Sequence, residues 1–441
     1  MNILIFGKSA ALGLLVTLST SGVVGAQQMA RVAPGEIDRL AAKVEPQVVA
    51  WRRDIHQHPE LGNREIRTAA LVAEHLRKLG LEVTTKVAHT GVVGVLRGGQ
   101  PGPVVALRAD MDALPGKETV DLPFASKAKT QYNGQEVSVM HACGHDAHTA
   151  ILMGVAEVLS SVRKELRGTV KFIFQPAEDS KPEGEEGGAE LMIKEGVLQN
   201  PEPEAIFGLH VVPYPSGVIG YRPGGIMAGV DNFRIVVQGR STHGGMPWYG
   251  VDPIPAAAQI VLGLQMVVSR QIDLTTAPAV VTVGMIRGGT QPNIVPGEVE
   301  LSGTVRSLDP KMRTEIRKRI ESTAAAIAQA SGAKAQVSFA SAGAPVTFND
   351  AGLMARVQPA LERAAGPGRG MVVPPVTAGE DFAFYQERIP GVFFFLGVAP
   401  KNTDPSKLAI NHSPAFFVDE SALVIGVRAL SQVAVYYLEG R

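Results

Sequence analysis

The sequence contains very little cysteine: Cys143 is the only one among 441 residues. A single cysteine cannot form a disulfide within the chain, so stability has to come from an ordinary hydrophobic core. The sequence also lacks an excess of either charge, because 42 lysines and arginines match 42 aspartates and glutamates. Without a basic excess the chain has no field to attract nucleic acid or an anionic membrane, and we expect neither partner.

Long apolar runs are scarce as well. Residues 10–18 form a largely apolar stretch that follows Lys8 and precedes small residues ending at Ala26. This pattern is typical of a signal peptide at residues 1–26, cleaved after Ala26, and the stretch is too short to span a membrane. No later segment looks apolar over the ~20 residues that a spanning helix needs. We therefore expect a secreted or periplasmic protein with no membrane contact after cleavage.

The densest chemistry lies in residues 140–148, where the only cysteine stands among three histidines. Thiolate and neutral imidazole are ligands that zinc-like cations favour, and Cys143 and His145 are close enough for one ion. Gly144 supplies the flexibility for a turn, and the apolar run at 150–159 predicts a helix that begins at the motif. Two other readings stay open here: a buried cysteine that only packs, and a cysteine nucleophile activated by a histidine.

The whole chain after residue 26 has a length that suits roughly two to three domains. Predicted helices and strands alternate through its first half. Such alternation is typical of an α/β domain with a largely parallel central sheet. His56 and His58, beside Pro59, are expected to be turn and surface groups. The expected helices are 36–57, 68–80, one after 148 and one near 187–195; the expected strands are 91–97, 104–107, 170–174 and 205–209.

Polar side chains follow three of these strands directly. In open α/β sheets, ligands bind outside the carboxyl ends of the strands. We therefore expect these side chains to converge at one edge of the sheet. They are Asp110 and Asp112, Glu178 and Asp179, and His210.

A different order of elements begins near residue 230 and predicts an inserted domain at 225–343. Its pattern of strand, helix, two strands, helix and strand is that of a ferredoxin-like unit. Glycine-rich segments at 222–225 and 341–345 bound it. The catalytic domain would then be split into residues 27–224 and 344–441. The second part is expected to hold a helix at 350–365, a strand at 392–396 and a closing helix at 419–438.

The residues support a metal site with a carboxylate beside it. One sulfur, three imidazoles and a carboxylate could hold one or two divalent ions. Glu178 and Asp179 point in different directions at a strand end, so Glu178 stays free to take a proton from an attacking water. The candidate ligands are Cys143, His145, Asp179, His210 and His412.

The order of the motifs resembles the aminoacylase/carboxypeptidase group of metallopeptidases. Within that group the chain is most similar to the amidohydrolase branch, which contains hippurate hydrolase, N-acyl-L-amino acid amidohydrolase and the auxin-conjugate hydrolases. The resemblance spans nearly the whole chain after residue 26. The motifs that carry it are residues 107–115, 141–148, 174–179, 241–247, 293–296, 379–382 and 411–414.

The resemblance implies a split catalytic domain of the zinc-exopeptidase type with two divalent ions per subunit, zinc being the ion that sulfur favours, with manganese, cobalt and nickel as alternatives. It implies that the insert is a ferredoxin-like lid that also forms a homodimer. By motif position, Glu178 would be the general base, and Cys143, His145, Asp179, His210 and His412 would be the metal ligands.

The resemblance also implies roles for four further residues. His243, in a Ser-Thr-His-Gly-Gly motif, would reach an active site, often that of the partner subunit, and polarise the scissile carbonyl. Asn293 and Arg306 would contact the substrate, Arg306 by a two-point hydrogen bond to a free carboxylate. Asp110 would lie behind the ligands and orient one of them.

These observations predict an exported metal-dependent amidohydrolase that cleaves N-acyl amino acids or short peptides with metal-activated water. The family motif has glutamate at the position of Asp179, whose shorter side chain could shift the ion. One alternative is a carboxypeptidase or dipeptidase that acts on unblocked peptides. An alternative of another class, motivated by Asp179, is a periplasmic binding protein without turnover.

Overall fold

The protein is described by a computed structural model that covers residues 31–33, 35–340, 343–401, 403–404 and 408–440. The predicted signal peptide at 1–26 lies outside the described residues, as do residues 341–342 of the predicted second linker.

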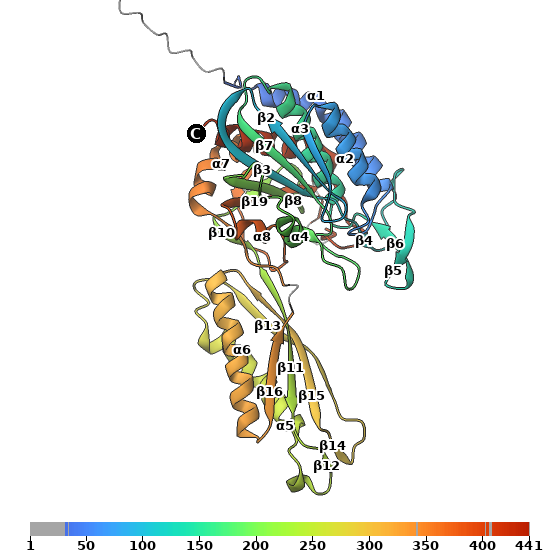
Figure 1. The fold of residues 1–441 in the computed structure, drawn as a ribbon, viewed down its shortest axis with the longest axis vertical. Helices are drawn as coiled ribbons and strands as arrows, with labels where there is room; N and C mark the ends of the chain where they lie inside the picture. The colour runs from blue at the N-terminus through green and yellow to red at the C-terminus, as the bar shows by residue number, and fades with distance from the viewer. Residues whose placement is uncertain (1–30, 34, 341–342, 402, 405–407, 441) are drawn as a thin grey trace, which may run out of the picture. The chain divides into compact units, whose positions relative to one another are not determined.

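An eight-stranded sheet forms the centre of the larger domain (Figure 1). Its four middle strands pair in parallel, whereas the hairpin at one edge is antiparallel and β9 runs antiparallel to β19. The sheet is thus largely parallel in its middle, as expected, with antiparallel pairs toward both edges. At the β1–β2 edge the short connecting turn requires the antiparallel pairing. The order is β1 (Glu82–Val87), β2 (Gly91–Arg97), β7 (Arg167–Gln175), β3 (Gln100–Asp110), β8 (Ala205–Pro215), β19 (Gly391–Ala399), β9 (Ile219–Tyr221) and β18 (Gly370–Val372).

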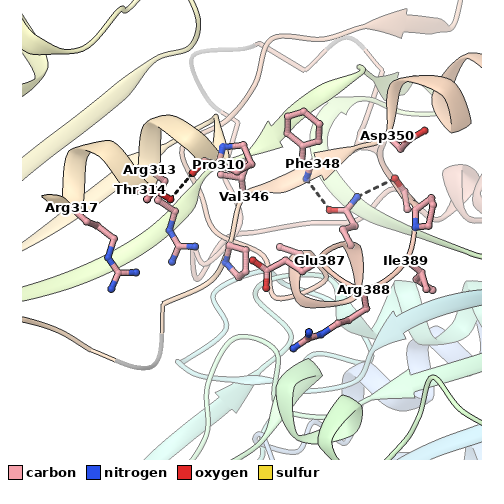
Figure 2. Close-up of a pocket in the computed structure, with 15 residues that line it drawn as sticks. Pro310, Arg313, Thr314, Arg317, Val346, Phe348, Asp350, Glu387, Arg388 and Ile389 are labelled. Atoms are coloured by element: carbon pink, nitrogen blue, oxygen red, sulfur yellow. Dashed lines mark hydrogen bonds between the residues drawn. The ribbon is translucent and has the colours of Figure 1, made fainter.

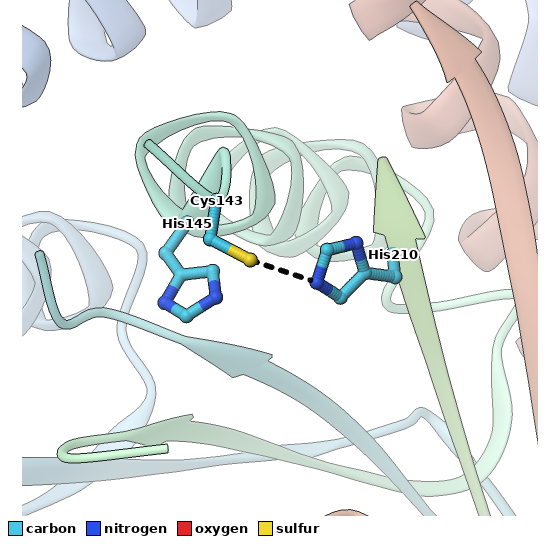
Figure 3. A group of neighbouring side chains, drawn as sticks. All are labelled: Cys143, His145 and His210. Atoms are coloured by element: carbon cyan, nitrogen blue, oxygen red, sulfur yellow. Dashed lines mark hydrogen bonds between the residues drawn. The ribbon is translucent and has the colours of Figure 1, made fainter. Parts of the chain in front are cut away.

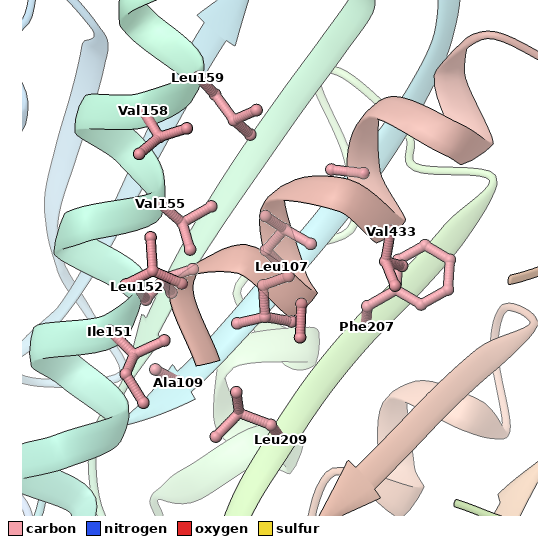
Figure 4. Close-up of a cluster of buried hydrophobic side chains, with 14 of the residues drawn as sticks. Leu107, Ala109, Ile151, Leu152, Val155, Val158, Leu159, Phe207, Leu209 and Val433 are labelled. Carbon is pink, nitrogen blue, oxygen red and sulfur yellow. The ribbon is translucent and has the colours of Figure 1, made fainter. Parts of the chain in front are cut away.

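Helices cover both faces of this sheet. The side chains of Leu107 and Ala109 on β3 join the core with α3, whereas Ala106 joins the core on the other face. Figure 4 shows α3 side chains such as Leu152 and Val155 packed over the first of these faces. One core contains α1 (Glu36–Gln57), α2 (Ile66–Lys78), α3 (His145–Ser161), α7 (Ala351–Ala365) and α9 (Leu423–Leu438); the other contains α4 (Gly188–Lys194) and α8 (Ala383–Gln386).

The closing helix corrects one expectation from the sequence. Residues Glu420–Leu438 are long and apolar enough to cross a membrane by length and composition, contrary to the prediction that no later segment would be. However, 78% of the apolar 18-residue window in this segment is buried inside the structure, because the helix packs against α1, α3 and α7. Its apolar character is explained by its place in the core.

A separate four-stranded antiparallel sheet has the predicted ferredoxin-like order of strands. Buried and less buried residues alternate along β11, so that Phe233, Ile235 and Val237 lie on one face and pack against two helices. The predicted fold class is thereby confirmed. The elements are β11 (Gly229–Gln238), α5 (Pro253–Met266), a π-helical turn (Val267–Gln271), β13 (Ala279–Gly288), β15 (Glu298–Ser307), α6 (Pro310–Ala330) and β16 (Lys334–Phe339), with sheet order β13-β15-β11-β16.

Short paired strands complete the chain. β10 and β17 flank the four-stranded unit in sequence and pair with each other. The two segments that connect this unit to the larger domain therefore lie side by side. The short elements are β4 (Leu114–Pro115), β5 (Lys129–Tyr132), β6 (Gln135–Met140), β10 (Gly224–Met227), β17 (Thr347–Asn349), β12 (Thr242–His243), β14 (Ile294–Val295), and the 3-10 turns η1 (Pro247–Tyr249) and η4 (Glu420–Ala422).

Candidate metal centre

Neighbouring strands bring the predicted polar residues to one edge of the large sheet. Asp110 ends β3 and lies beside Gln175, which ends β7, so the turn with Glu178 and Asp179 follows at the same edge. β8 continues to Pro215 rather than ending at residue 209, but its pairing with β3 stops at Gly208, just before His210. The expected convergence is observed.

The start of α3 adds the cysteine and a histidine. Cys143 precedes the helix and His145 is its first residue, with Gly144 between them in a left-handed conformation at φ 92°. A Cβ atom on Gly144 would lie 2.3 Å from Cγ2 of Val211 on β8. The turn therefore requires glycine both for its backbone angle and for the close approach to β8.

Replacing Gly144 tests this requirement. We expect Gly144→Ala to weaken metal binding at least tenfold, since ligand orientation is typically worth 10 to 100-fold in metal affinity. The matched control is Gly134→Ala in the turn between β5 and β6, where φ is 78° and nothing lies within 4 Å of the added carbon. Chelator-competition titrations of both variants give the measurement. Equal metal affinities in the two variants would contradict the steric argument.

The five predicted ligands meet in space. Figure 3 shows Cys143 and His145 at the start of α3 facing His210 on β8, with 3.3 Å between Cys143 Sγ and His210 Nε2. His412 Nε2 lies 3.2 Å from both Cys143 Sγ and Asp179 Oδ1. His145 Nε2 lies 3.6 Å from Asp179 Oδ2. Two of the groups of potential ligand atoms among the described residues share Cys143: one with His145 and His210, the other with Asp179 and His412.

Two buried atoms of this cluster lack a hydrogen-bond partner in the described structure: His145 Nε2 and Asp179 Oδ2. Burying a polar group without a partner is costly. Burial lowers the pKa of His210 to about 3, so its imidazole is neutral and able to bind a metal. Burial, together with the charge of Asp179, raises the pKa of the Cys143 thiol, and a thiolate there requires a nearby cation. The donor set therefore fits divalent metal ions.

Asp112 orients the cluster from behind. Its Oδ1 lies 3.1 Å from His145 Nδ1, whereas the nearest oxygen of Asp110 is 3.8 Å away. Asp110 instead pairs with Arg108 and with Nδ1 of His148. Sequence reasoning placed Asp112 at this edge without a role and did not single out His148. The available signal for Asp112 was its position two residues after Asp110, at the end of the same strand.

Glu178 lies beside the cluster with its carboxylate partly fixed. Its Oε1 accepts a hydrogen bond of 3.3 Å from the backbone N–H of Asp381, and its Oε2 lies 3.8 Å from His145 Nε2. Burial raises the pKa of Glu178, and the nearby carboxylates of Glu380, Asp179 and Asp381 raise it further. A raised pKa makes this carboxylate a stronger proton acceptor than an ordinary glutamate.

His56 is not the turn or surface group that the sequence suggested. It is buried, with Nδ1 2.8 Å from Asp146 Oδ2 and Nε2 2.9 Å from Glu118 Oε1. The end of α1 packs against the start of α3, which carries Asp146, and this contact encloses the ring. His58 is exposed, as expected.

The other predicted substrate contacts lie in the four-stranded domain. His243 on β12 pairs with Ile294 on β14, and the carbonyl oxygen of Asn293 accepts a hydrogen bond from Gly244. Arg306 lies on β15, where its Nη1 donates to the carbonyl of Val305. In the part of the chain that the structure describes, no hydrogen bond or ion pair joins these three side chains to the cluster.

A hollow of about 550 Å³ elsewhere carries none of the candidate ligands. Arg313 and Arg317 of α6 line it together with Phe348, Gln386 and Arg388 (Figure 2). Both α6 arginines pair with Asp231 on β11. Their charge is therefore already engaged, and the hollow adds no reactive group to the metal cluster.

Comparisons with known proteins show what this chain is similar to. A family model described as Peptidase family M20/M25/M40 matches residues 106–436. Thermostable carboxypeptidase 2 of Saccharolobus solfataricus is 40% identical over 397 residues, which cover 90% of this chain and 96% of that protein. N-acetylcysteine deacetylase of Bacillus subtilis is 40% identical over 395 residues, covering 89% and 97%. A solved structure from Bacillus subtilis, described as a dinuclear metal binding peptidase, has 36% identity and a TM-score of 0.75 over 90% of this chain and 99% of that one.

Proposed function

Since the chain belongs to peptidase family M20/M25/M40 and is a metal-dependent hydrolase of C–N bonds, we propose that it cleaves the amide bond of N-acyl amino acids or short peptides. Two relatives are named as an N-acetylcysteine deacetylase and a carboxypeptidase, and both names support substrates with an amide next to an amino acid. The observation that carries the proposal is the convergence of five ligand side chains with Glu178 beside them. A hydrolase also has a use for Glu178 that a binding protein would not have.

The ligands would be Cys143, His145, Asp179, His210 and His412, holding two divalent ions per subunit from among zinc, manganese, cobalt and nickel. Divalent ions held there lower the pKa of water and polarise a carbonyl oxygen. A solved relative described as a dinuclear metal binding peptidase supports the number two.

Glu178 performs the proton transfers in this proposal. Its Oε1 is engaged by the N–H of Asp381, so Oε2 is the oxygen that takes the proton of the attacking water. The same carboxyl then delivers the proton to the leaving amine. Its raised pKa supports the first step, because it makes the carboxylate a stronger proton acceptor than an ordinary glutamate.

Residues of the four-stranded domain would complete the site. His243 is exposed and would polarise the scissile carbonyl, and Asn293 beside it would contact the substrate. Arg306 has no ion pair among the described residues, so its guanidinium can take a substrate carboxylate.

A homodimer through this domain is supported by exposed apolar side chains on α5 and β13, and sedimentation would test it. They are Leu262, Met266, Val280, Met285 and Ile286.

Export is part of the proposal because residues 1–26 have the pattern of a signal peptide. N-terminal sequencing of the protein recovered from the producing cell should begin at Gln27. An intact N-terminus in the cytosolic fraction would contradict export and leave the proposed activity untouched.

Metal removal tests the activity. The mature protein, stripped with a chelator, should lose hydrolysis of N-acetyl amino acids and regain it with zinc, manganese, cobalt or nickel. A parallel panel of dipeptides separates the alternative, a carboxypeptidase or dipeptidase, which the name of one relative favours. Rapid release of amino acids from dipeptides with poor hydrolysis of acylated ones would support that alternative. Hydrolysis that is indifferent to chelation would contradict the proposal and return Cys143 to consideration as a nucleophile.

A further inference from the structure

The turn that carries Glu178 and Asp179 has an unusual backbone. Ala177, the residue before Glu178, has φ 53°, a left-handed conformation that a non-glycine residue rarely adopts. Such a conformation costs free energy and persists only where the surroundings impose it. The direction in which the two carboxylates point therefore depends on what holds this turn.

Two buried carboxylates hold three successive N–H groups of the turn. Asp112 accepts hydrogen bonds from the N–H groups of Glu178 at 3.1 Å and Asp179 at 3.0 Å. Glu65 accepts the third, from Ala177, at 2.9 Å. Asp112 follows β3 of the same sheet edge, whereas Glu65 comes from the start of α2.

The Glu65 side chain is itself fixed. It is completely buried, and its second oxygen accepts a hydrogen bond from the hydroxyl of Thr90. The chain around it fits closely against the turn: a Cβ on Gly62 would lie 1.8 Å from the carbonyl oxygen of Ser180 and 3.1 Å from Cα of Ala177. The segment before α2 thus presses on the turn from one side, with Glu65 as its hydrogen-bonding group.

A purely structural role as a helix cap does not account for this carboxylate. Glu65 is the first flanking residue of α2, but its side chain makes no capping hydrogen bond. Glu60 performs that task, since its carboxylate accepts from the N–H groups of Arg67 at 2.9 Å and Thr68 at 2.8 Å. The carboxylate of Glu65 is directed away from its own helix and toward the turn.

We propose that Glu65 is a positioning residue that holds Ala177 in its left-handed conformation and so aims Glu178 and Asp179 at the site. The proposal rests on the proposed function, in which these two residues act as base and ligand. It predicts that loss of Glu65 impairs both proton transfer and metal binding, because one turn carries both groups.

The test compares Glu65→Ala with Glu65→Gln. We expect Glu65→Ala to lower kcat and metal affinity by about 10 to 100-fold each, a size typical of groups behind metal ligands, with a smaller change in KM. Glu65→Gln keeps a carbonyl oxygen for the Ala177 N–H and should restore both values to within about threefold of the parent. If Glu65→Ala fails to fold, Thr90→Val, which frees the same carboxylate, should show a smaller fall in both values.

Glu60→Ala is the matched control. It removes a cap from the same helix, so it should lower the melting temperature while kcat and metal affinity stay at the parent level. If Glu65→Ala behaves like Glu60→Ala, Glu65 is only structural and the proposal is overturned. Glu178→Gln, measured in parallel, distinguishes a failure of the proposed function from a failure of the proposed role of Glu65. Full activity of Glu178→Gln would refute the proposed function, whereas an inactive Glu178→Gln with unimpaired Glu65→Ala would refute only the role of Glu65.

Discussion

Glu178→Gln should lower kcat by about 10²- to 10⁴-fold, the range that a general base contributes. Glutamine has the same shape, and its carbonyl oxygen can still accept the 3.3 Å hydrogen bond from Asp381 N–H. It cannot accept a proton from water at neutral pH. Because Glu178 lies beside the ligands rather than among them in the proposal, the metal content should stay at the parent value. The measurements are kcat on an N-acetyl amino acid and metal stoichiometry of the same preparation.

Glu183→Gln provides the matched control for this prediction. Glu183 is exposed and lies five residues further along the same loop, so its replacement removes a carboxylate without touching the cluster. It should leave kcat unchanged. The loss in Glu178→Gln should appear equally in kcat and kcat/KM, as expected for an interaction made in the transition state. A kcat within about threefold of the parent would exclude Glu178 as the base.

The convergence of the candidate ligands could be predicted from the sequence because it depends on topology. Buried strands that alternate with helices form a parallel sheet, and the residues after such strands reach one edge. Asp110, Glu178 and Asp179 follow this rule closely. The ferredoxin-like order of the inserted unit was also predictable, because strands and helices differ in their hydrophobic period and their order along the chain can be read from it.

The contacts behind the ligands could not be predicted in this way. Whether Asp110 or Asp112 reaches His145 depends on how the chain turns after β3 ends at Asp110 and on where α3 begins. His56 was misread because its burial arises from the packing of α1 on α3, far away in the sequence. The hydrogen bond of Glu65 to Ala177 likewise joins residues 112 positions apart.

Arg108→Met should lower the free energy of unfolding by about 3–5 kcal/mol, the usual effect of leaving buried charges without their partner. The Arg108 guanidinium is fully buried and lies 2.6 Å from Asp110, 3.0 Å from Glu380 and 2.7 Å from Asp381. Methionine fills much of the space of the arginine stem but removes the positive charge that these three carboxyls share. The urea midpoint of unfolding gives the measurement. Arg39→Met, which breaks an exposed pair with Glu36, is the control and should leave the midpoint unchanged.

The destabilisation should also depend on pH in a definite direction. Burial raises the pKa of Glu380 to about 8 and that of Asp381 to about 6, even with Arg108 beside them. Both carboxyls therefore bind their protons more tightly in the folded than in the unfolded protein, where their pKa values are 4.5 and 3.8. Folded stability from these groups is greatest when they are protonated and falls as pH rises through this range.

Removing Arg108 raises both pKa values further, so the difference in free energy of unfolding between variant and parent should be larger at pH 8 than at pH 5. A difference that is constant over this range would show that Arg108 contributes mainly by packing, and that the carboxyls around Glu178 do not depend on its charge.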